Sequence, residues 1–523
     1  MMPAPTRLRA TILAGFAAAG VAACAFTAAA QISVSPPAPA EPSQATWPGA
    51  GIGCHRIEPF FRAALGRRVH VFGIGDSNHV YATHGWEDGW THELVERGGV
   101  WSTGLHALGE NEGNGSGIGY RCRVVANAST GGFIYADAGT PFDRLMSGAN
   151  SLGNSHYVAL PAGAVQNSIR RAGLVVDGDS PLLASGDLRF KLFIGRHASS
   201  SASLRPVIRF DDAPYTVISE HGPFPMSGPD DIRSITLEQG GVAAGRPISC
   251  LLARPGAPDY ETPLTALYAS AEDPHRSTGF AYHVLYYRGG HSARTMAHAL
   301  RSVELDQLRL FFSLAVGDAG GGEPPMALVR INTGLNDLRE ANPSVGEGLT
   351  PGSSPAAYAD NLRSIMDRVT EAWTAAGFGA SELHFLLTPS HPIAGPDGET
   401  LSLYRAQAEA VALSRARTAC VRLDRLTTWQ EMLEQGWYQL SGADQYHLQQ
   451  SAYRELSRRE LDALGRWCPG DWNGDGAVDS DDLILFLTDW ERGEADADRS
   501  GSTDSDDLLA FFGSWDGGGC DGE

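Results

Sequence analysis

A short apolar run that ends in a polar turn limits most strongly what this chain can fold into. Val69–Ile74 is rich in β-forming residues and suits a buried strand. The turn Gly75-Asp76-Ser77-Asn78 follows at once, and the aromatic-rich segment after it, which ends at Gly98-Gly99, is predicted to be helical. A serine in such a turn presents its hydroxyl and backbone N–H at the carboxyl end of the strand, where a helix N-terminus favours negative charge. Ser77 is therefore a candidate nucleophile and oxyanion donor.

Two later motifs carry the groups that a serine nucleophile needs. Met326–Thr333 is another strand-like run, and it ends in Gly334-Leu335-Asn336-Asp337, where the side-chain amide of Asn336 can donate to a developing oxyanion. Asp444-Gln445-Tyr446-His447 comes near the end of the less acidic part of the chain and precedes a helix-like stretch through Leu461. In a tight turn, the aspartate can fix the tautomer of the histidine, and the histidine can take the serine proton.

Taken in this order, the three motifs resemble the blocks of the SGNH (GDSL-type) hydrolase family. The family has a further block, a glycine after its second strand. Phe280–Tyr287 matches that strand and Arg288–Ser292 matches the block. The resemblance implies a flavodoxin-like three-layer α/β/α sandwich with a parallel sheet, and a metal-free serine mechanism. The residues it implies are a triad of Ser77, His447 and Asp444, and an oxyanion hole of Ser77, Gly290 and Asn336.

The remaining pattern supports an α/β fold. The predicted elements are an amphipathic helix over Tyr358–Ala376, a strand over Leu383–Thr388, a helix over Leu403–Ala416 and a last strand over Cys420–Leu423. A second candidate for the glycine block, Trp101-Ser102-Thr103-Gly104, lies nearer to Ser77, but no convincing strand precedes it, so Gly290 is preferred.

A long insertion departs from the compact family pattern, because Ser77 and Gly290 are 213 positions apart. Short β-like runs separated by Gly, Pro, Ser and Asp predict an inserted β-sandwich or β-barrel-like module. Its role stays open between glycan binding, a lid and a structural buttress. The runs are Phe133–Ala136, Tyr157–Leu160, Leu188–Ile194, Val207–Phe210, Tyr215–Ile218 and Ile232–Leu237.

Several histidines near these motifs have two interpretations. His79, His84 and His92 follow the serine and can line its pocket, although positions on helix or loop surfaces are the more ordinary expectation. His291 follows the glycine block and can touch substrate.

The C-terminal segment contains an acidic repeat of 25 residues. Each copy offers oxygen ligands at loop positions 1, 3, 5 and 12, a backbone carbonyl at position 7, and an apolar helix afterwards, over Leu483–Trp490 and Leu508–Trp515. Position 12 is Asp rather than Glu, and the loops occur in tandem, so the segment resembles a dockerin type I module. The resemblance implies two structural calcium ions and a cohesin-type scaffold as a possible partner. The implied ligands are Asp471, Asn473, Asp475, Ala477 and Asp482 in the first loop, and Asp496, Asp498, Ser500, Ser502 and Asp507 in the second.

Charge separates this segment from the rest of the chain. The whole chain has 40 basic and 61 acidic side chains, a net charge of −21, which makes it a poor general binder of nucleic acid or anionic membranes. From Cys468 onward there are 16 acidic and two basic side chains, so −14 of the net charge lies in the last 56 residues.

The N-terminal residues have the pattern of an export signal. Arg7 and Arg9 precede an apolar run, and Ala28-Ala29-Ala30 offers a cleavage site before Gln31. Val21–Cys24 also resembles a lipoprotein box, so the expected location is secreted or at the cell surface, with lipid anchoring at Cys24 as an alternative. No stretch is expected to span a membrane.

Six cysteines remain after Gln31, and an even number in an exported protein permits disulfides. Cys468 and Cys520 bracket the acidic segment and are the favoured pair. The pairing of Cys54, Cys122, Cys250 and Cys420 stays open, including the alternative that some are buried thiols.

These observations predict an exported serine esterase that hydrolyses acyl esters, acetyl in the first place, on polysaccharide. The alternatives are a non-catalytic carbohydrate-binding or adhesion protein on the same scaffold, and a lipase or thioesterase. The predicted division is a signal peptide over 1–30, a flexible lead-in over 31–52, hydrolase domain over 53–100 and 279–466, β-rich insertion over 101–278 and dockerin-like repeat over 467–523.

Overall fold

The structure is a computed structural model of the 523-residue chain. Among the helices of the part it describes, none is both long and apolar enough to cross a membrane. The described residues are 50–79, 85–97, 99–107, 122–125, 158–160, 173–196, 203–212, 214, 216–225, 227, 231–242, 244–252, 264–287, 291–302, 305–317, 324–339, 354–439, 444–465, 468–474, 477–498, 500 and 502–516.

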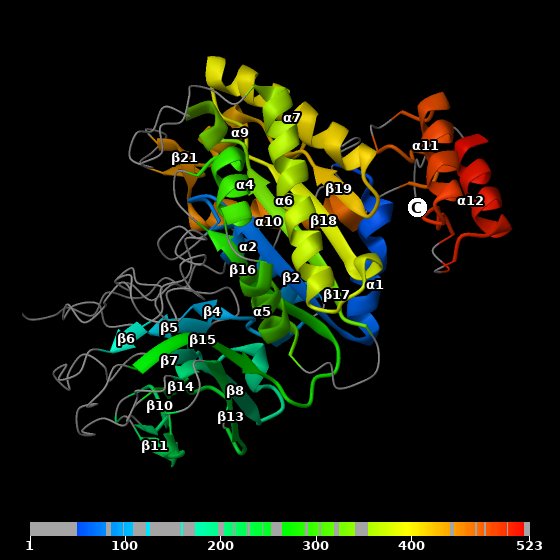
Figure 1. The fold of residues 1–523 in the computed structure, drawn as a ribbon. Coiled ribbons are helices and arrows are strands. Elements are labelled where there is room, and N and C mark those ends of the chain that lie inside the picture. The colour runs from blue at the N-terminus through cyan, green and yellow to red at the C-terminus, as the bar shows by residue number, and fades with distance from the viewer. Residues whose placement is uncertain are drawn as a thin grey trace, which may run out of the picture. The chain divides into compact units, whose positions relative to one another are not determined.

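A mixed, mostly parallel sheet forms the centre of the α/β fold (Figure 1). Within the described residues, its parallel part is, in order across the sheet, β19 (Thr418–Val421), β18 (Leu383–Pro389), β17 (Met326–Thr333), β2 (Arg68–Gly75), β16 (Gly279–Tyr287) and β3 (Val100–Ser102). The short strand β1 (Gly51–Ile52) adds antiparallel to β19 at one edge. All eight residues of β17 are buried, as expected for a strand covered on both faces.

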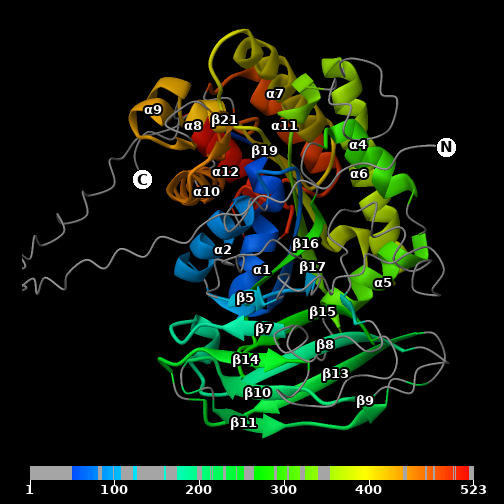
Figure 2. The ribbon, with the colours of Figure 1, turned by 90° about the vertical axis from the view of Figure 1, so that its left-hand side faces the viewer.

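Helices cover both faces of this sheet, and the view along its edge shows the layers (Figure 2). Side chains alternate along β2: Val69 and Val71 belong to one apolar cluster, and Phe72 and Ile74 to the other. The first cluster contains α1 (Glu58–Gly66), α2 (Trp86–Arg97) and α10 (Gln450–Gly465). The second contains α4 (Ala293–Ser302), α5 (Leu305–Val316), α6 (Pro355–Ala375) and α7 (Pro396–Ser414).

The sequence pattern predicted most of these elements, with shifted ends. The strand over Met326–Thr333 has the predicted bounds, and the amphipathic helix is α6, which Ser354 caps by accepting from Ala357 N–H. The last parallel strand is shifted toward the N-terminus relative to the prediction Cys420–Leu423, since β19 begins at Thr418 and ends at Val421, and the short helix α8 (Leu423–Leu426) begins two residues later. The short helix α9 (Trp429–Glu434) follows.

The β-rich insertion is not a separate sandwich, because one of its sheets continues the central sheet. Strand β3 pairs antiparallel with β15 (Leu264–Glu272), and β8 (Leu188–Arg196) and β13 (Asp231–Gln239) follow outward. The small strands β4 (His106–Ala107) and β6 (Val158–Leu160) also pair with β15. This pairing covers the edge that the parallel sheet would otherwise leave open.

A second, antiparallel sheet packs against this extension. Its order is β11 (Val217–Glu220), β10 (Val207–Phe210), β14 (Ile248–Leu251), β7 (Gly173–Val176) and β5 (Cys122–Val125). Apolar side chains of both sheets, such as Ile208 and Leu192, belong to one buried cluster that continues to Val69 in the central strand. Short paired strands elsewhere are β12 (Phe224–Pro225) with β9 (Ser203–Leu204). The predicted run Phe133–Ala136 lies outside the described residues.

Of the four cysteines whose pairing the sequence leaves open, three are buried free thiols. Cys54, Cys250 and Cys420 are free and buried. Burial raises the pKa of the Cys54 thiol to about 12, which keeps it protonated and unreactive. Cys468 is disulfide-bonded, whereas Cys520 and the side chain of Cys122 lie outside the described residues.

The C-terminal repeat (residues 468–516) forms two helices around a small core. Helices α11 (Ser480–Glu491) and α12 (Ser505–Asp516) meet through Phe486 and Phe511, whose rings stack 4.1 Å apart. Trp472 also belongs to this core. Leu487 and Phe512, which the 25-residue pattern places in the same core, are instead exposed, at 44% and 38%.

A buried ion pair links this repeat to the segment before α1. Asp489 of α11 accepts hydrogen bonds from Arg56 Nε and Nη2, both at 3.0 Å, and lies 3.1 Å from His55 Nε2. The side chains of Arg56 and Asp489 are both 0% exposed. The Trp472 indole N–H donates to the same carboxylate at 3.0 Å, so the charge is well compensated.

Candidate functional sites

The carboxyl ends of three neighbouring strands bring the predicted motifs together. Register pairs Gly75 with Tyr287 of β16 on one side and with Asn332 of β17 on the other. Ser77 follows β2 and Asn336 follows β17, so both leave the sheet at the same edge. This is where parallel α/β sheets place their ligand sites.

Ser77, His447 and Asp444 lie in hydrogen-bonding contact. Ser77 Oγ is 3.0 Å from His447 Nε2, and His447 Nδ1 donates to Asp444 Oδ2 at 2.8 Å. Because the carboxylate accepts only, the Nδ1 proton is fixed and Nε2 is left to accept from the serine hydroxyl. The side chains of His447 and Asp444 are 23% and 24% exposed, so a substrate can reach them.

The segment that carries the histidine differs from the predicted turn. Asp444 and His447 lie on the short strand β21 (Asp444–Leu448), which pairs with β20 (Tyr438–Gln439) across an irregular register. Asp444 Oδ1 accepts from the backbone N–H groups of Tyr446 at 2.9 Å and His447 at 3.3 Å. Burial by itself raises the pKa of Asp444, but the hydrogen bonds from His447 and from these N–H groups outweigh it, and the net pKa is lowered. The carboxylate therefore stays ionised opposite the imidazole.

Asn336 is held by the aspartate of the nucleophile turn. Its Nδ2 donates to Asp76 Oδ2 at 2.9 Å and to the backbone oxygen of His291 at 3.3 Å. Asp76 is 0% exposed, and its other oxygen accepts from the backbone and side-chain N–H groups of Asn78 at 2.9 and 3.2 Å. Burial raises the pKa of Asp76, and the hydrogen bonds from Asn78 and Asn336 oppose that rise.

The two glycine candidates have different outcomes. Gly290 lies outside the described residues, although the strand before it is present as predicted. Gly104 is remote from Ser77: the pairing of β3 with β16 is at Phe280 and Ala281, the start of β16, and a Cβ at Gly104 would lie 1.9 Å from the carbonyl oxygen of Tyr282. Tyr282 pairs with Val71, six positions before Ser77, or about 20 Å along a strand. Gly104 therefore permits close strand packing rather than catalysis.

The helix after Ser77 begins later than the motif suggests. Helix α2 starts at Trp86, and the carbonyl oxygens of Asn78 and His79 accept from Trp86 and Glu87 N–H at 2.9 and 3.0 Å. These first-turn N–H groups therefore do not point at the serine, and the expected direct influence of the helix N-terminus on Ser77 is wrong.

The neighbouring histidines are mostly structural. His79 is fully buried behind β2, where a Cβ at Gly73 would lie 2.2 Å from its ring, so it is on neither a pocket wall nor a surface. Burial lowers the pKa of His79 to about 3. His92 is half-buried in α2 and His84 lies outside the described residues. His291 is buried, with Nδ1 in contact with the Tyr286 hydroxyl.

The two acidic loops of the C-terminal repeat have the same hydrogen-bond pattern. Asp482 accepts from the N–H groups of Asn473 and Asp479, both at 2.8 Å. In the second copy, Asp507 accepts from Asp498 N–H at 3.0 Å and from Asp504 N–H at 2.7 Å. Both closing carboxylates are buried. The 25-residue repeat is thus a repeat of structure as well as of sequence.

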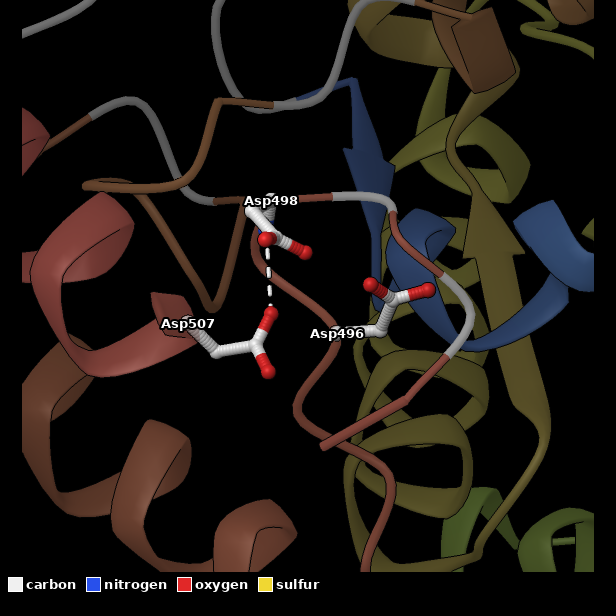
Figure 3. Close-up of side chains that lie close together, drawn as sticks. All are labelled: Asp496, Asp498 and Asp507. Carbon is white, nitrogen blue, oxygen red and sulfur yellow. Dashed lines mark hydrogen bonds between the residues drawn. The ribbon is translucent and has the colours of Figure 1, made fainter. Parts of the chain in front are cut away.

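Three carboxylates of the second loop converge. Asp496, Asp498 and Asp507 each offer an oxygen, and these oxygens lie within 4.8 Å of one another (Figure 3). Ser500 and Ser502 are exposed, and their hydroxyls lie 3.1 Å apart. In the first loop, Asp471 and Asn473 are half-buried and Ala477 is exposed, whereas Asp475 lies outside the described residues.

Sequence reasoning missed several groups that support the site. Asp76 stands inside the Gly-Asp-Ser motif, yet only the structure shows that it holds Asn336. Tyr453 bonds to Asn78 across 375 positions, and nothing local in the sequence points to it. Such long-range side-chain contacts leave no periodic pattern.

Comparison with solved structures finds esterases that share little sequence identity with this chain. A structure described as a peptidoglycan O-acetylesterase in action is 12% identical with a TM-score of 0.40, covering 79% of this chain and 94% of that one. A family two carbohydrate esterase from Clostridium thermocellum, in complex with cellohexaose, is 9% identical with a TM-score of 0.25 and coverage of 56% and 91%.

An acetyl xylan esterase from the rumen bacterium Butyrivibrio proteoclasticus is 10% identical, with a TM-score of 0.25 and coverage of 57% and 89%. No family model matches the sequence, and no curated protein matches it. Likeness at this level assigns neither activity nor substrate to the chain.

Proposed function

We propose that this chain is an exported serine esterase that removes acyl groups, acetyl in the first place, from polysaccharide. The observation that carries the proposal is the contact of Ser77 Oγ with His447 Nε2 at 3.0 Å, together with the bond of His447 Nδ1 to Asp444 at 2.8 Å. A nucleophile, a base and an orienting carboxylate in this order are the parts of acyl transfer.

In the first half-reaction, Ser77 Oγ attacks the ester carbonyl carbon while His447 Nε2 takes the hydroxyl proton. The tetrahedral oxyanion is stabilised by the Ser77 backbone N–H and by Asn336 Nδ2, with the N–H of Gly290 as a further donor. Asn336 reaches the oxyanion by giving up its longer bond, the one at 3.3 Å to His291 O, and keeps its bond to Asp76. Collapse of this intermediate expels the alcohol, which receives the proton from His447.

In the second half-reaction, water attacks the acyl-serine. His447 Nε2 takes a proton from the water, and Asp444 stabilises the imidazolium that forms. The second tetrahedral intermediate releases the carboxylic acid, and His447 returns its proton to Ser77 Oγ. The chain ends each cycle in its starting protonation state.

The acidic loops fit calcium as a structural ion. Asp496, Asp498 and Asp507 offer converging carboxylate oxygens, the donor type that this hard cation prefers. We propose that the second loop holds one ion through these residues with Ser500 and Ser502, and that the first holds another through Asp471, Asn473, Asp475, Ala477 and Asp482. Bound calcium would neutralise the repulsion between the loop carboxylates.

The same repeat suggests a protein partner and a substrate class. Ile484 and Leu487 of α11 and Leu509 of α12 are exposed, at 64%, 44% and 71%. The dockerin resemblance makes a cohesin-type scaffold the proposed partner of the repeat, with these exposed apolar side chains as candidate contacts. The dockerin resemblance also makes an acylated carbohydrate the leading proposed substrate. The proposed secretion or cell-surface location rests on Arg7, Arg9 and the apolar run after them.

The proposal is tested by measuring hydrolysis of p-nitrophenyl acetate and release of acetate from acetylated xylan. The wild-type chain is expected to turn over both, and Ser77→Ala to lose about 10⁴-fold or more in turnover. Circular dichroism and thermal melting show whether the variant is folded. A folded Ser77→Ala chain with wild-type turnover would contradict the assignment.

A further inference from the structure

One buried hydroxyl joins the nucleophile turn to the strand of the histidine. Tyr453 of α10 is 0% exposed, and its OH donates to Asn78 Oδ1 at 2.6 Å. The same oxygen accepts from the backbone N–H of Leu448 at 3.3 Å. Asn78 follows Ser77 in the chain, and Leu448 follows His447. The hydroxyl therefore bonds to the residue after the proposed nucleophile and to the residue after the proposed base.

The hydrogen bonds continue from this hydroxyl to the proposed oxyanion donor. Asn78 Nδ2 donates to Asp76 Oδ1 at 3.2 Å, and Asn336 Nδ2 donates to Asp76 Oδ2 at 2.9 Å. Each donor and acceptor is used in a consistent direction: the single phenol proton goes to Asn78 Oδ1, which turns the amide nitrogen of Asn78 toward the carboxylate. Tyr453, Asn78 and Asp76 are all buried, where such bonds are strong and costly to break.

Helix α10 holds the phenol in place by its own contacts. The Tyr453 ring packs edge-on against Trp86, with centroids 5.3 Å apart. Two turns further along, the fully buried Glu460 accepts from Arg330 of β17 at 2.9 Å and from the Trp90 indole at 2.8 Å. The helix is therefore fixed to β17 and α2 independently of the phenol, and the position of the hydroxyl is set by the fold.

We propose that Tyr453 is a positioning residue for the ester hydrolysis described above, holding His447 and Ser77 in register and keeping the Asp76–Asn336 pair aligned for the oxyanion. This inference rests on the proposed function. The hydroxyl touches neither substrate nor reacting atoms, so it acts on turnover through the groups it holds. Small misplacements of such groups have large effects on rate.

The test is Tyr453→Phe in the full chain, with Tyr438→Phe as the matched control. Tyr438 is also buried, and it belongs to the strand paired with β21, but its hydroxyl donates to Pro392 O at 2.7 Å, outside the chain of bonds to Asn336. Both variants lose one buried hydroxyl. With p-nitrophenyl acetate, Tyr453→Phe is expected to lower kcat about 10- to 100-fold with KM within about twofold, whereas Tyr438→Phe keeps the wild-type kcat.

A double-mutant comparison distinguishes a positioning role of Tyr453 from a general loss of stability. Combined with Asn336→Ala, the Tyr453→Phe change is expected to add less than its own factor, because both act on one set of bonds. Asn78→Ala removes the other end of the phenol bond, and its kcat loss is expected to be at least as large as that of Tyr453→Phe. This second variant decides the matter if Tyr453→Phe does not fold.

The proposed esterase function and the positioning role of Tyr453 are contradicted by different results. If the wild-type chain has no Ser77-dependent hydrolysis, the proposed function fails and the positioning role fails with it. If the wild type is active but Tyr453→Phe keeps its kcat, or Tyr438→Phe loses as much, the positioning role alone is overturned.

Discussion

Asn336 donates its side-chain N–H to Asp76 at 2.9 Å, although the two residues are 260 positions apart in the chain. The bond joins the turn after β2 to the turn after β17 at the edge of the sheet. Asp76 is the residue before the proposed nucleophile, so the same buried carboxylate shapes the serine turn and aims the proposed oxyanion donor.

The bond between Asn336 and Asp76 predicts that substitutions at both residues lower kcat, and that the loss is larger at Asn336. Asn336→Ala removes one proposed oxyanion donor and is expected to lower kcat about 10²- to 10³-fold, with KM for p-nitrophenyl acetate little changed. Asp76→Asn keeps the shape but removes the charge that accepts from Asn336 and Asn78, and it is expected to lower kcat less than Asn336→Ala does. Steady-state kinetics measures both. An Asn336→Ala chain with unchanged kcat would require another donor.

Chelation is expected to separate stability from catalysis. The proposed triad mechanism needs no metal, whereas the carboxylates of the acidic loops repel one another when no cation is bound. If the loops bind calcium as proposed, EDTA is expected to lower the melting temperature and the helix signal of α11 and α12 while kcat at 25 °C stays within about twofold, because an ion that binds only the folded form stabilises that form. Calorimetry with calcium is expected to show two sites. Loss of kcat that zinc restores would contradict the metal-free mechanism.

The buried ion pair between Arg56 and Asp489 predicts a large cost on truncation. Asp489→Ala leaves the Arg56 charge buried without its carboxylate, which typically costs about 3–5 kcal/mol of unfolding free energy. The matched control is Asp360→Ala, which breaks an exposed pair with Arg363 and is expected to cost about 0–1 kcal/mol. Urea unfolding of the full chain compares the two. Equal losses would show that Asp489 is not buried in solution.

Buried histidines predict that stability falls in mild acid. Burial lowers the folded-state pKa of His70 and His79 to about 3, and of His384 and His391 to about 4. In the unfolded chain these rings bind protons below about pH 6.5, while the folded chain does not until pH 3–4, so unfolding takes up protons and stability decreases as pH falls between those limits.

The slope is about 1.4 kcal/mol per pH unit for each histidine that is fully protonated only when unfolded. Urea unfolding at pH 7, 6 and 5 measures this slope, and His384→Asn is expected to reduce it. An unfolding free energy that is the same at pH 7 and pH 5 would contradict this account.

Much of the fold could be predicted because local pattern determines it. The buried strand before Ser77 and the strand over Met326–Thr333 are nearly continuous apolar runs, and α6 has a clear apolar face. The extension of the central sheet by β15 could not be predicted, because the residues of a strand do not show which distant strand its edge will pair with.

Some residues of the candidate site could be predicted from the sequence and others could not. Ser77, Asn336, Asp444 and His447 are in short motifs, and the structure brings them to one edge of the sheet. Tyr453 is an ordinary helix residue in the sequence, and its importance depends on which turn the folded helix covers. The late start of α2 was also missed, since its start depends on backbone bonds to Asn78 and His79.

Covalent labelling gives the sharpest test of Ser77 as the nucleophile and His447 as its base. The full chain is treated with diethyl p-nitrophenyl phosphate, which phosphorylates activated serines, and the modified peptide is identified by mass spectrometry. We expect one diethylphosphoryl group per chain, on Ser77, and labelling at least about 10²-fold slower in folded His447→Ala. Labelling at another residue, or at an undiminished rate in His447→Ala, would contradict this assignment.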